Sequence, residues 1–366
     1  MKRASSSDAH RPLGWLRARL FPNWLSSFAT LTIIYLAWRI VPPLLDWAIV
    51  HAVWSPENSR LCREAVGQGA CWAFIADKYR FILFGTFPAD EHWRPALVIV
   101  ILLGLYAASA LGYARRAGLV VAWLAGLATI GVLMWGGLLG LSYVENERWG
   151  GLTLTLLLST VGLACAFPLS ILLALARRSG LPILRWFAIA YIELIRGVPL
   201  VSVLFMASVM LPLFLPAGVS IDKLLRAQLA MIFFAAAYLA EVVRGGLQAM
   251  PRQQEEAAQA LGLGYWQRTW FVILPQALRI AIPPLVNTFI GFFKDTSLVV
   301  VIGLFDFLTT IKVSLSEPAW SGFGVEAYLF AAAGYFLFCY PMSRYSQTLE
   351  RQAVPGRGME ERIKVG

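Results

Sequence analysis

Four polar residues lie in or just beyond an apolar stretch near the carboxyl end of the chain: Asn287, Lys294, Asp295 and Thr296. A polar side chain in a membrane-spanning stretch usually faces protein or a water-filled path, because placing it in lipid is costly. A small zwitterion needs a cation or donor for its carboxylate and an acceptor for its ammonium, and these residues supply both. They are candidates for a translocation pathway, whereas packing or hydrogen bonding between helices explains each of them equally well.

The sequence contains no motif for catalysis or for nucleotide binding. No Gly-x-x-x-x-Gly-Lys-[Ser/Thr] pattern occurs, and the dipeptide Gly-Lys is absent, so no loop is predicted to hold phosphates. No Ser/His/Asp or Cys/His arrangement and no HExxH pair is present, and the histidines and cysteines lack metal-ligand spacing. We therefore expect no catalytic residue, no metal site and no cofactor in this chain.

Residues 250–276 are the most polar stretch of the second half and combine small residues, glycines and aromatic residues. Residues 252–261 are suited to a short helix whose small side chains would let the surface of another protein approach closely. These small residues are Ala257, Ala258 and Ala260. Gly262 and Gly264 are expected to take positive φ angles that turn the chain. A second short helix then leads to Pro275, which is tolerated in the first turn of a helix.

Two pairs of opposite charges stand three residues apart near the ends of apolar stretches, Glu193 with Arg196 and Glu241 with Arg244. Charges at positions i and i+3 lie on one face of a helix and neutralise each other where solvation is poor. The simplest explanation is an arginine with a local partner. The functional alternative is that these pairs brace an inner gate or a contact with a partner.

The composition indicates that these residues are positioned by a membrane protein. Hydrophobic residues make up 58% of the 366 residues and charged residues only 14%, against roughly 45–50% and about 25% in soluble domains. Apolar stretches of about 18–25 residues recur, which is the length that ~30 Å of hydrocarbon requires of a helix. The Lys and Arg residues behind the net charge of +10 lie at the ends of these stretches, which argues against nucleic-acid binding. The predicted fold class is an all-α polytopic membrane protein.

About eight membrane-spanning helices are expected, since a helix of roughly 20 residues crosses the bilayer. The candidate spans are residues 26–50, 95–113, 118–144, 151–176, 198–215, 225–247, 271–293 and 325–344. Residues 181–197 carry charges and are expected on the inner surface instead. Lys and Arg accumulate on one side if the amino terminus is inside, so both termini are predicted to be cytoplasmic. The apolar part of the first span is too long for a signal peptide, which favours a retained anchor.

Residues 51–93 form a long outer segment that is rich in aromatic residues. We expect it to fold onto the membrane surface, as amphipathic interfacial helices do. Cys62 and Cys71 lie in this segment, outside the membrane, where disulfides persist. They are either joined in a disulfide or are two buried free thiols.

Residues 256–275 resemble the coupling segment of the permease subunits of bacterial ABC importers. The pattern is Glu-Ala-Ala, three residues, Gly, nine residues, Ile, one residue and Leu-Pro, with Val272 here in the Ile position. The matching residues are Glu256, Ala257, Ala258, Gly262, Leu274 and Pro275. The resemblance implies that Glu256 to Gly262 form a coupling helix, which docks into a groove of an ATPase subunit.

Further stretches resemble the polar amino-acid (HisM-like) branch of this family. They are residues 176–180, 191–200, 240–246, 274–279 and 294–298. The resemblance covers roughly residues 150–350, and it implies a type I importer core of five spans. Residues 1–149 would then be an amino-terminal extension with three spans, and residues 351–366 a cytoplasmic tail. Such a long extension is similar to the large permease of general L-amino-acid importers of the Aap/Bzt type.

The resemblance implies a permease that moves L-amino acids across the bacterial inner membrane, with ATP and Mg²⁺ bound by a partner and not by this chain. The implied partners are a second homologous permease, two ATPase subunits, a periplasmic amino-acid-binding protein and membrane lipid. The alternative is an ion-coupled secondary transporter of small polar solutes. Such a transporter would show paired inverted repeats and broken helices at the bilayer midplane. Five core spans cannot be divided into equal inverted halves.

Overall fold

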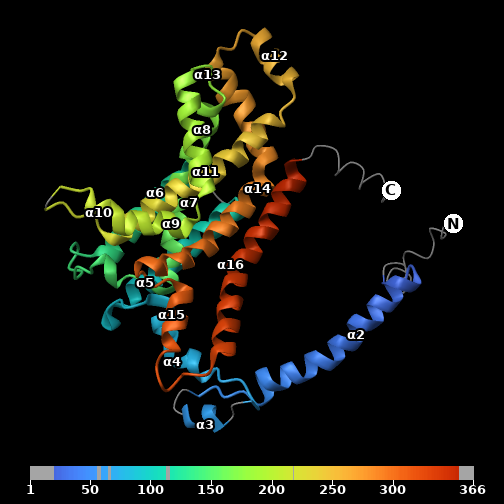
Figure 1. Cartoon of the computed structure of the whole chain (residues 1–366), viewed down its shortest axis with the longest axis vertical. Coiled ribbons are helices and arrows are strands. Elements are labelled where there is room, and N and C mark those ends of the chain that lie inside the picture. Colours follow the sequence, from blue (N-terminus) through green and yellow to red (C-terminus); the bar gives the residue numbers. More distant parts are fainter. Residues whose placement is uncertain (1–19, 56–58, 65–66, 113–115, 217, 354–366) are drawn as a thin grey trace. The chain divides into compact units, whose positions relative to one another are not determined.

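The computed structural model describes residues 20–55, 59–64, 67–112, 116–216 and 218–353 (Figure 1). These residues are almost all helical, and within them the only extended pairing is two isolated β-bridges. Seven helices of the described chain are long and apolar enough to cross a membrane, or eight if one bent pair counts as a single span. The prediction of an all-α polytopic membrane protein is confirmed.

The chain forms two compact units, residues 1–77 and 78–366. The long helices are α2 (Trp24–Leu45), α5 (Trp93–Leu111), α6 (Arg116–Trp135), α7 (Gly151–Arg177), α8 (Pro182–Gly197), α11 (Lys223–Gln248), α14 (Leu274–Asp295) and α16 (Gly324–Ala353). The shorter α-helices are α3 (Ser59–Glu64), α4 (Ala73–Phe84), α9 (Leu200–Phe205), α10 (Leu211–Leu213), α12 (Arg252–Ala260), α13 (Tyr265–Gln267) and α15 (Phe307–Ser314). The π- and 3₁₀-helical turns are η2 (Asp46–Val50), η3 (Ala89–Glu91), η4 (Asn146–Arg148), η5 (Met206–Met210), η6 (Arg268–Ile273) and η7 (Thr296–Ile302).

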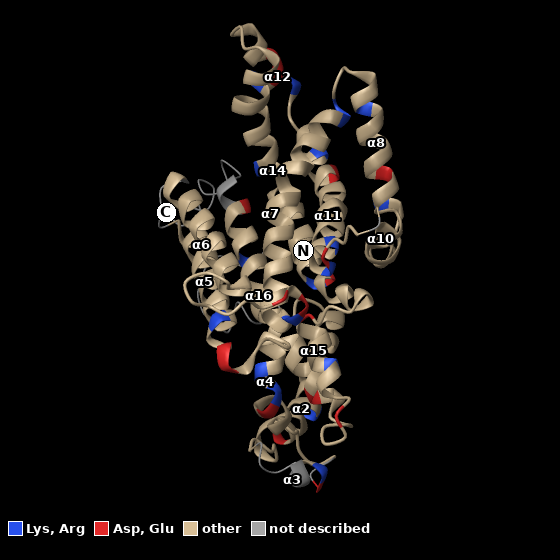
Figure 2. Ribbon diagram, turned by 90° about the vertical axis from the view of Figure 1, so that its left-hand side faces the viewer, with Lys and Arg blue, Asp and Glu red and all other residues tan. Residues whose placement is uncertain are grey.

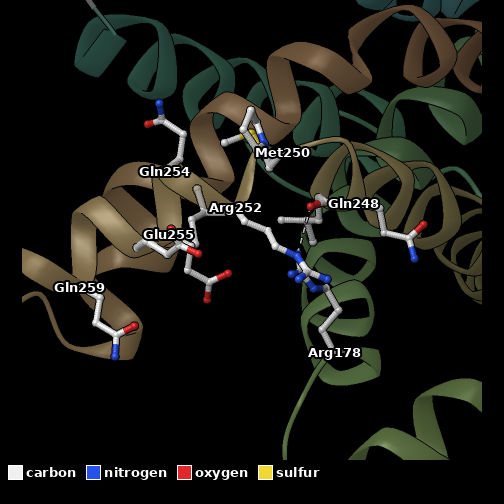
Figure 3. A pocket seen from close by; sticks show the side chains of 11 residues that line it. Arg178, Gln248, Met250, Arg252, Gln254, Glu255 and Gln259 are labelled. Atoms are coloured by element: carbon white, nitrogen blue, oxygen red, sulfur yellow. Dashed lines mark hydrogen bonds between the residues drawn. The ribbon is translucent and has the colours of Figure 1, made fainter.

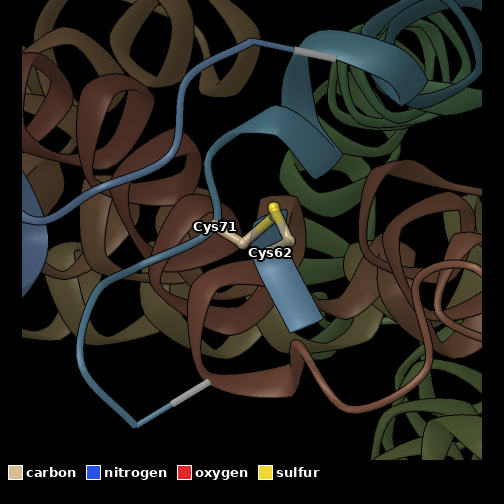
Figure 4. Close-up of a disulfide and its surroundings, with 2 residues drawn as sticks. All are labelled: Cys62 and Cys71. Atoms are coloured by element: carbon tan, nitrogen blue, oxygen red, sulfur yellow. A yellow bond between two sulfur atoms is a disulfide. The ribbon is translucent and has the colours of Figure 1, made fainter. Parts of the chain in front are cut away.

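The first unit contains α2, which continues into η2, and a small disulfide-bonded segment. Cys62 of α3 and Cys71 are joined in a disulfide with a Cα–Cα distance of 5.4 Å (Figure 4). The indole Nε1 of Trp72 donates a hydrogen bond to the carbonyl oxygen of Ala48 at 2.7 Å. This bond holds the chain before α4 close to η2, and the disulfide ties α3 to the same stretch of chain.

The third predicted span, residues 118–144, is wrong in its length. α6 ends at Trp135, and Gly136 and Gly137 then take φ angles of 70° and 74°. Glycine adopts these angles at little cost, so the chain turns instead of continuing as a helix. A Cβ atom on Gly136 would lie 1.9 Å from the carbonyl oxygen of Ser142, so no other residue fits this turn.

The predicted span at residues 198–215 is also interrupted. α8 and the segment Leu200–Leu213 meet at a bend of 104°, and the segment contains the π-helical turn η5. Pro199 disfavours a helical conformation in the residue before it, and Val198 accordingly has φ −112° and ψ 136°. α8 packs against both α7 and α11 (Figure 1).

α11 packs most extensively against α7 and α14 and forms the centre of the second unit. Its buried face carries alanines at positions 230, 235, 236, 237 and 240. Small residues let the backbones of membrane helices approach closely, and this favours their packing. At Gly246 a Cβ atom would lie 2.5 Å from the carbonyl oxygen of Ala277 in α14, so this approach depends on glycine.

Asp306 joins several segments at the other end of α7 from α12, and the sequence analysis did not single it out. It is fully buried and caps α15, since its carboxylate accepts hydrogen bonds from the backbone N–H groups of Leu308 and Thr309 at 3.0 and 3.1 Å. Burial raises the pKa of the Asp306 carboxyl, and these hydrogen bonds oppose the rise only in part. An Asp directly before a Phe-Leu-Thr-Thr run is typical of a helix N-cap, so the capping role of this residue could have been predicted from the sequence.

Arg94 was likewise missed, and it explains the turn after α6. Its side chain is fully buried at the start of α5 and forms an ion pair with Glu91. It also donates hydrogen bonds to the carbonyl oxygens of Leu133 and of Ser142, the second at 3.0 Å. One guanidinium thereby holds α5 to the end of α6.

We expect Arg94→Met to lower the stability of the protein more than Arg148→Met does. Removing the guanidinium leaves the Leu133 carbonyl without its side-chain donor and the Glu91 carboxylate, only 19% exposed, without its cationic partner, although the Ser142 hydroxyl still donates to it. Loss of a buried charged partner costs about 2 kcal/mol or more. Arg148 is exposed and serves as the control. Thermal unfolding of the purified protein in detergent checks this, and equal midpoints for the two variants would contradict the buried contact.

Candidate coupling site and translocation path

The coupling segment consists of α12, a bend at Gly262, and α13 continuing through η6 into α14. Gly262 has φ 76°. Its N–H donates to the carbonyl oxygen of Gln259 at 2.9 Å, and the N–H of Leu263 donates to that of Ala258 at 3.2 Å. These two bonds form the Schellman motif, in which a left-handed residue closes a helix and satisfies its last carbonyls.

The prediction of a positive φ at Gly264 is wrong. Gly264 has φ −66° and ψ 165°, an extended conformation that any residue adopts without strain. The N–H of Gly264 donates to Oε1 of Gln267 at 3.0 Å, so the residue begins α13. One left-handed residue is enough to reverse the chain, and the second glycine is free to adopt an ordinary conformation.

The exposed face of α12 differs in part from the prediction. Glu256 and Ala257 are exposed, as a docking surface requires. Ala258 is only 3% exposed, because this face of α12 packs against η6. The small size of Ala258 therefore serves packing within the chain, and the expectation that it faces another protein is wrong. Leu274 is also buried, and Pro275 lies in the first turn of α14.

Two polar contacts join α12 to η6 and to the start of α14, which follows η6 directly. Oε1 of Gln254 accepts a hydrogen bond from Nε2 of Gln276 at 3.4 Å. Glu255 forms an ion pair with Arg268 of η6, with a distance of 3.7 Å between the Glu Oε1 and Arg Nε atoms. A displacement of α12 therefore acts on the base of α14.

A cavity of about 420 Å³ lies between α12 and the adjoining ends of α7 and α11 (Figure 3). Its lining is largely polar and includes Arg178, Gln248, Arg252 and Glu255. Arg178 donates a hydrogen bond to the carbonyl oxygen of Leu247 at 3.2 Å, which joins the ends of α7 and α11 beside the cavity. The cavity leaves room beneath α12 for the helix to move relative to α7.

The predicted pathway residues occupy two environments. Asn287 and Lys294 are exposed on α14, and Pro284 and Ile280 lie at helical spacing on the same face. Polar side chains on the outer face of a span are costly in lipid, so this face is suited to a water-filled path or to another protein. Asp295 is half-buried, and in the described chain it forms no ion pair within 4.0 Å.

Thr296 differs from these residues. It is fully buried at the start of η7, and its hydroxyl donates to the carbonyl oxygen of Phe293 at 2.8 Å. Because the hydroxyl already has a hydrogen-bond acceptor in the preceding turn, Thr296 is explained by packing within the chain and not by contact with a substrate.

Charged residues of α7, α8 and α11 form one network, and Figure 2 shows the charges on α8 and α11. Glu241 pairs with Arg244, with 2.9 Å between Oε2 and Nε. Glu193 does not pair with Arg196 as predicted, but with Arg177 of α7 at 2.9 Å. Arg196 instead lies 3.9 Å from Glu241. The i and i+3 spacing allows a pair within one helix, but the packing of α8 against α7 offers Glu193 a closer partner.

Arg177 is the member of this network that the sequence analysis missed as a site residue. It contacts Glu193 at 2.9 Å and Glu241 at 3.4 Å, and so joins α7 to both α8 and α11. The local signal is an arginine in the last turn of a long apolar helix. That position alone does not reveal which carboxylates the arginine meets.

Comparison with known proteins identifies the family. Residues 166–353 match the model of the binding-protein-dependent transport system inner membrane component family. The chain belongs to this family. It is 47% identical to the inner membrane amino-acid ABC transporter permease protein YhdY of Escherichia coli K12, over 97% of this chain and 96% of the relative.

A second relative is the glutamate/glutamine/aspartate/asparagine transport system permease protein BztC of Rhodobacter capsulatus. It is 37% identical, over 92% of this chain and 93% of the relative. A solved structure, the crystal structure of an amino acid ABC transporter with histidines, is 32% identical in sequence. The match covers 55% of this chain and 92% of the chain in that structure, with a TM-score of 0.49.

This permease is a polytopic inner-membrane transport component of the ABC importer class, and the resemblance to that class is confirmed. It is a transport subunit and not an enzyme. The assignment excludes the ion-coupled secondary transporter that the sequence left as an alternative. The segment Glu256 to Gly262 lies within the residues that match the family.

Proposed function

We propose that this permease moves L-amino acids across the inner membrane and that α12 transmits the conformational change of a partner ATPase to the membrane-spanning helices. The observation that carries the proposal is the form of α12. It exposes Glu256 and Ala257, is closed by a left-handed Gly262 and is bonded to the base of α14. A rigid, exposed helix joined to a span is suited to convert docking into movement of that span.

The substrate class is supported by the relatives and by the chemistry of α14. Both similar permeases carry amino acids according to their names. Lys294 offers a cation for a carboxylate, and Asp295 an acceptor for an ammonium group. Neither side chain is occupied by an ion pair among the described residues, so both are available to a zwitterion that passes along this face.

The proposed assembly contains this chain, a second homologous permease, two ATPase subunits that bind ATP and Mg²⁺, and a periplasmic amino-acid-binding protein. Residues 150–350 would form the five-span core, which agrees with the family match over residues 166–353. Residues 1–149 would be an extension with three spans. Residues 351–366 would be a cytoplasmic tail, of which 354–366 lie outside the described residues.

In the proposed mechanism, closure of the two ATPase subunits displaces α12. The displacement reaches α14 through the Gln254–Gln276 and Glu255–Arg268 contacts. It reaches α11 through the short connection between Gln248 and Arg252, where Pro251 is the residue before α12. A tilt of α14 relative to α11 would then change the access to Asn287 and Lys294.

Reconstitution tests the function directly. The permease should co-purify with an ATPase subunit, and proteoliposomes that contain the assembly should take up L-amino acids only with ATP inside and the binding protein outside. A variant of the ATPase that cannot hydrolyse ATP is the control. Uptake that follows an ion gradient without ATP, or the absence of any associated ATPase, would contradict the proposal.

The orientation of the chain can be tested with single cysteines. In a background that keeps only the Cys62–Cys71 disulfide, we introduce one cysteine at Ser5, Ser142 or Ser346. An impermeant thiol reagent added outside should label position 142 alone, because Lys and Arg retain both termini inside. Ser142 is exposed in the turn after α6, whereas Ser5 lies outside the described residues. Labelling at 5 or 346 in intact cells would reverse the proposed topology.

A further inference from the structure

The charge network of α7, α8 and α11 has two kinds of contact. Glu241 and Arg244 lie on the same helix and make two hydrogen bonds, one of them at 2.9 Å. The contacts of Glu241 with other helices are longer, at 3.4 Å to Arg177 of α7 and 3.9 Å to Arg196 of α8. The carboxylate is therefore held firmly on α11 and loosely across the helix boundaries.

The network is exposed to different degrees at the surface of this chain. The side chains of Arg177 and Glu241 are 20% and 23% exposed, and that of Glu193 is 55% exposed. Ion pairs in contact with solvent are weak and exchange readily with water, unlike pairs in a dry interior. The contact of the largely exposed Glu193 can thus open at small cost, and the two contacts of Glu241 with other helices are already long.

α8 is the element that these contacts hold. It follows a turn at Ser179 and Gly180 and ends at the 104° bend before Leu200. Besides the ion pairs, it has two hydrogen bonds with α11: 2.7 Å from the Tyr191 hydroxyl to the Phe233 carbonyl, and 3.5 Å from the Tyr238 hydroxyl to the Arg196 carbonyl. The Arg196 guanidinium also lies over the Tyr238 ring, 5.6 Å from its centroid. α8 is therefore a helix between two breaks in the chain that packs on both α7 and α11.

The network lies close to the coupling segment. Glu241 is two turns before the end of α11, and α11 leads into α12 through a short connection. Arg177 is the last residue of α7, and its neighbour Arg178 bonds to Leu247 of α11. A movement of α12 would therefore act on the ends of the two helices that carry Glu241 and Arg177.

We propose that Arg177 and Glu241 are positioning residues that latch α8 to α7 and α11, and that this latch opens in each transport cycle. The inference rests on the proposed function, because it assigns the release to the movement of α12. The side chains touch no substrate. They set the equilibrium between a state with α8 held and a state with α8 released.

The first measurement is the accessibility of Ile192, which is fully buried on α8. In a background without Cys165 and Cys339, Ile192→Cys should react slowly with a small thiol reagent while the latch is closed. Adding Arg177→Gln or Glu193→Gln should speed the reaction about two- to tenfold. Leu194→Cys, at a position that is 66% exposed, should react at the same rate with and without the charge substitutions. This measurement requires no substrate, so it is independent of whether the protein carries amino acids.

The second measurement is activity in proteoliposomes. Arg177→Gln and Glu241→Gln should raise ATP hydrolysis without the binding protein about two- to tenfold and should lower uptake per ATP. Arg177→Lys, which keeps the charge, should restore much of the coupling. Arg185→Gln is the matched control, since Arg185 is exposed on α8 and forms no ion pair among the described residues.

Three outcomes would overturn the latch: an unchanged rate at Ile192→Cys in both charge variants, unchanged basal hydrolysis, or an equal effect of Arg185→Gln. If Arg177→Gln does not reach the membrane, Glu193→Gln decides the question, because Glu193 is largely exposed and its loss does not strand a buried charge. Accessible Ile192→Cys in a protein that transports no amino acid would support the latch and contradict the proposed function.

Discussion

Gly262→Val is expected to abolish coupled transport in a protein that still inserts into the membrane. The φ angle of 76° at this residue is readily open to glycine, but it strains a β-branched residue by about 1–2 kcal/mol. No atom lies within 4 Å of a Cβ placed there, so the effect comes from the backbone and not from a clash. We expect the strain to be relieved by opening of the Schellman motif, which would change the direction of α12.

Gly264→Val is the matched control for this prediction. Gly264 lies two residues further along the same bend, but its φ of −66° is ordinary for a β-branched residue. In proteoliposomes with the ATPase subunits, Gly262→Val should lose ATP hydrolysis stimulated by the binding protein, and uptake, by tenfold or more. Gly264→Val should lose much less of either. Tightly coupled uptake in Gly262→Val would show that α12 is not the transmission element.

The docking face of α12 can be tested in the same assay with two neighbouring alanines. Ala257→Trp places a bulky side chain on the exposed face and should block the ATPase without changing the stability of the isolated permease. Ala258→Trp should also remove activity, but by displacing α12 from η6, since Ala258 is 3% exposed. Overpacking of this kind costs about 1–3 kcal/mol, so only Ala258→Trp should lower the thermal midpoint of the isolated permease.

Replacing Lys294 or Asp295 with alanine is expected to reduce uptake tenfold or more while the binding protein still docks. The residues end α14 side by side, Lys294 exposed and Asp295 half-buried, with no ion pair among the described residues to hold them. A passing zwitterion would meet both charges, and charged hydrogen bonds are worth about 1.5–3 kcal/mol each. Loss of one such bond corresponds to a factor of roughly ten or more in rate or affinity.

Lys312→Ala is the control for the path prediction, because Lys312 is exposed on α15 and lies outside the spans. Uptake and binding-protein docking are measured separately, the second by co-sedimentation with proteoliposomes. Equal uptake by Lys294→Ala and the parent protein would remove Lys294 from the path. Loss of folded protein from the membrane in both α14 variants would show instead that the two charges stabilise the fold.

Features of the chain that depend on local composition could be predicted from the sequence. The lengths of the apolar stretches predicted the helical membrane fold, because hydrocarbon thickness sets the length of a span regardless of its neighbours. The spacing from Glu256 to Pro275 indicated the family, since a helix, a bend and a helix are formed by contacts within about 20 residues. The bend at Gly262 is of the same kind, because a left-handed angle is a property of one residue.

The partners of individual side chains were decided only by the tertiary structure. Ala258 faces η6, Glu193 meets Arg177 of another helix, and Thr296 is buried. The sequence places a residue on a helix but does not fix the rotation of that helix about its axis, which is set by the packing of distant helices. After α6, Gly136 and Gly137 let the chain turn, but the contacts that hold the turn come from Arg94, more than 30 residues earlier in the chain, and they exist only once α5 and α6 have packed together.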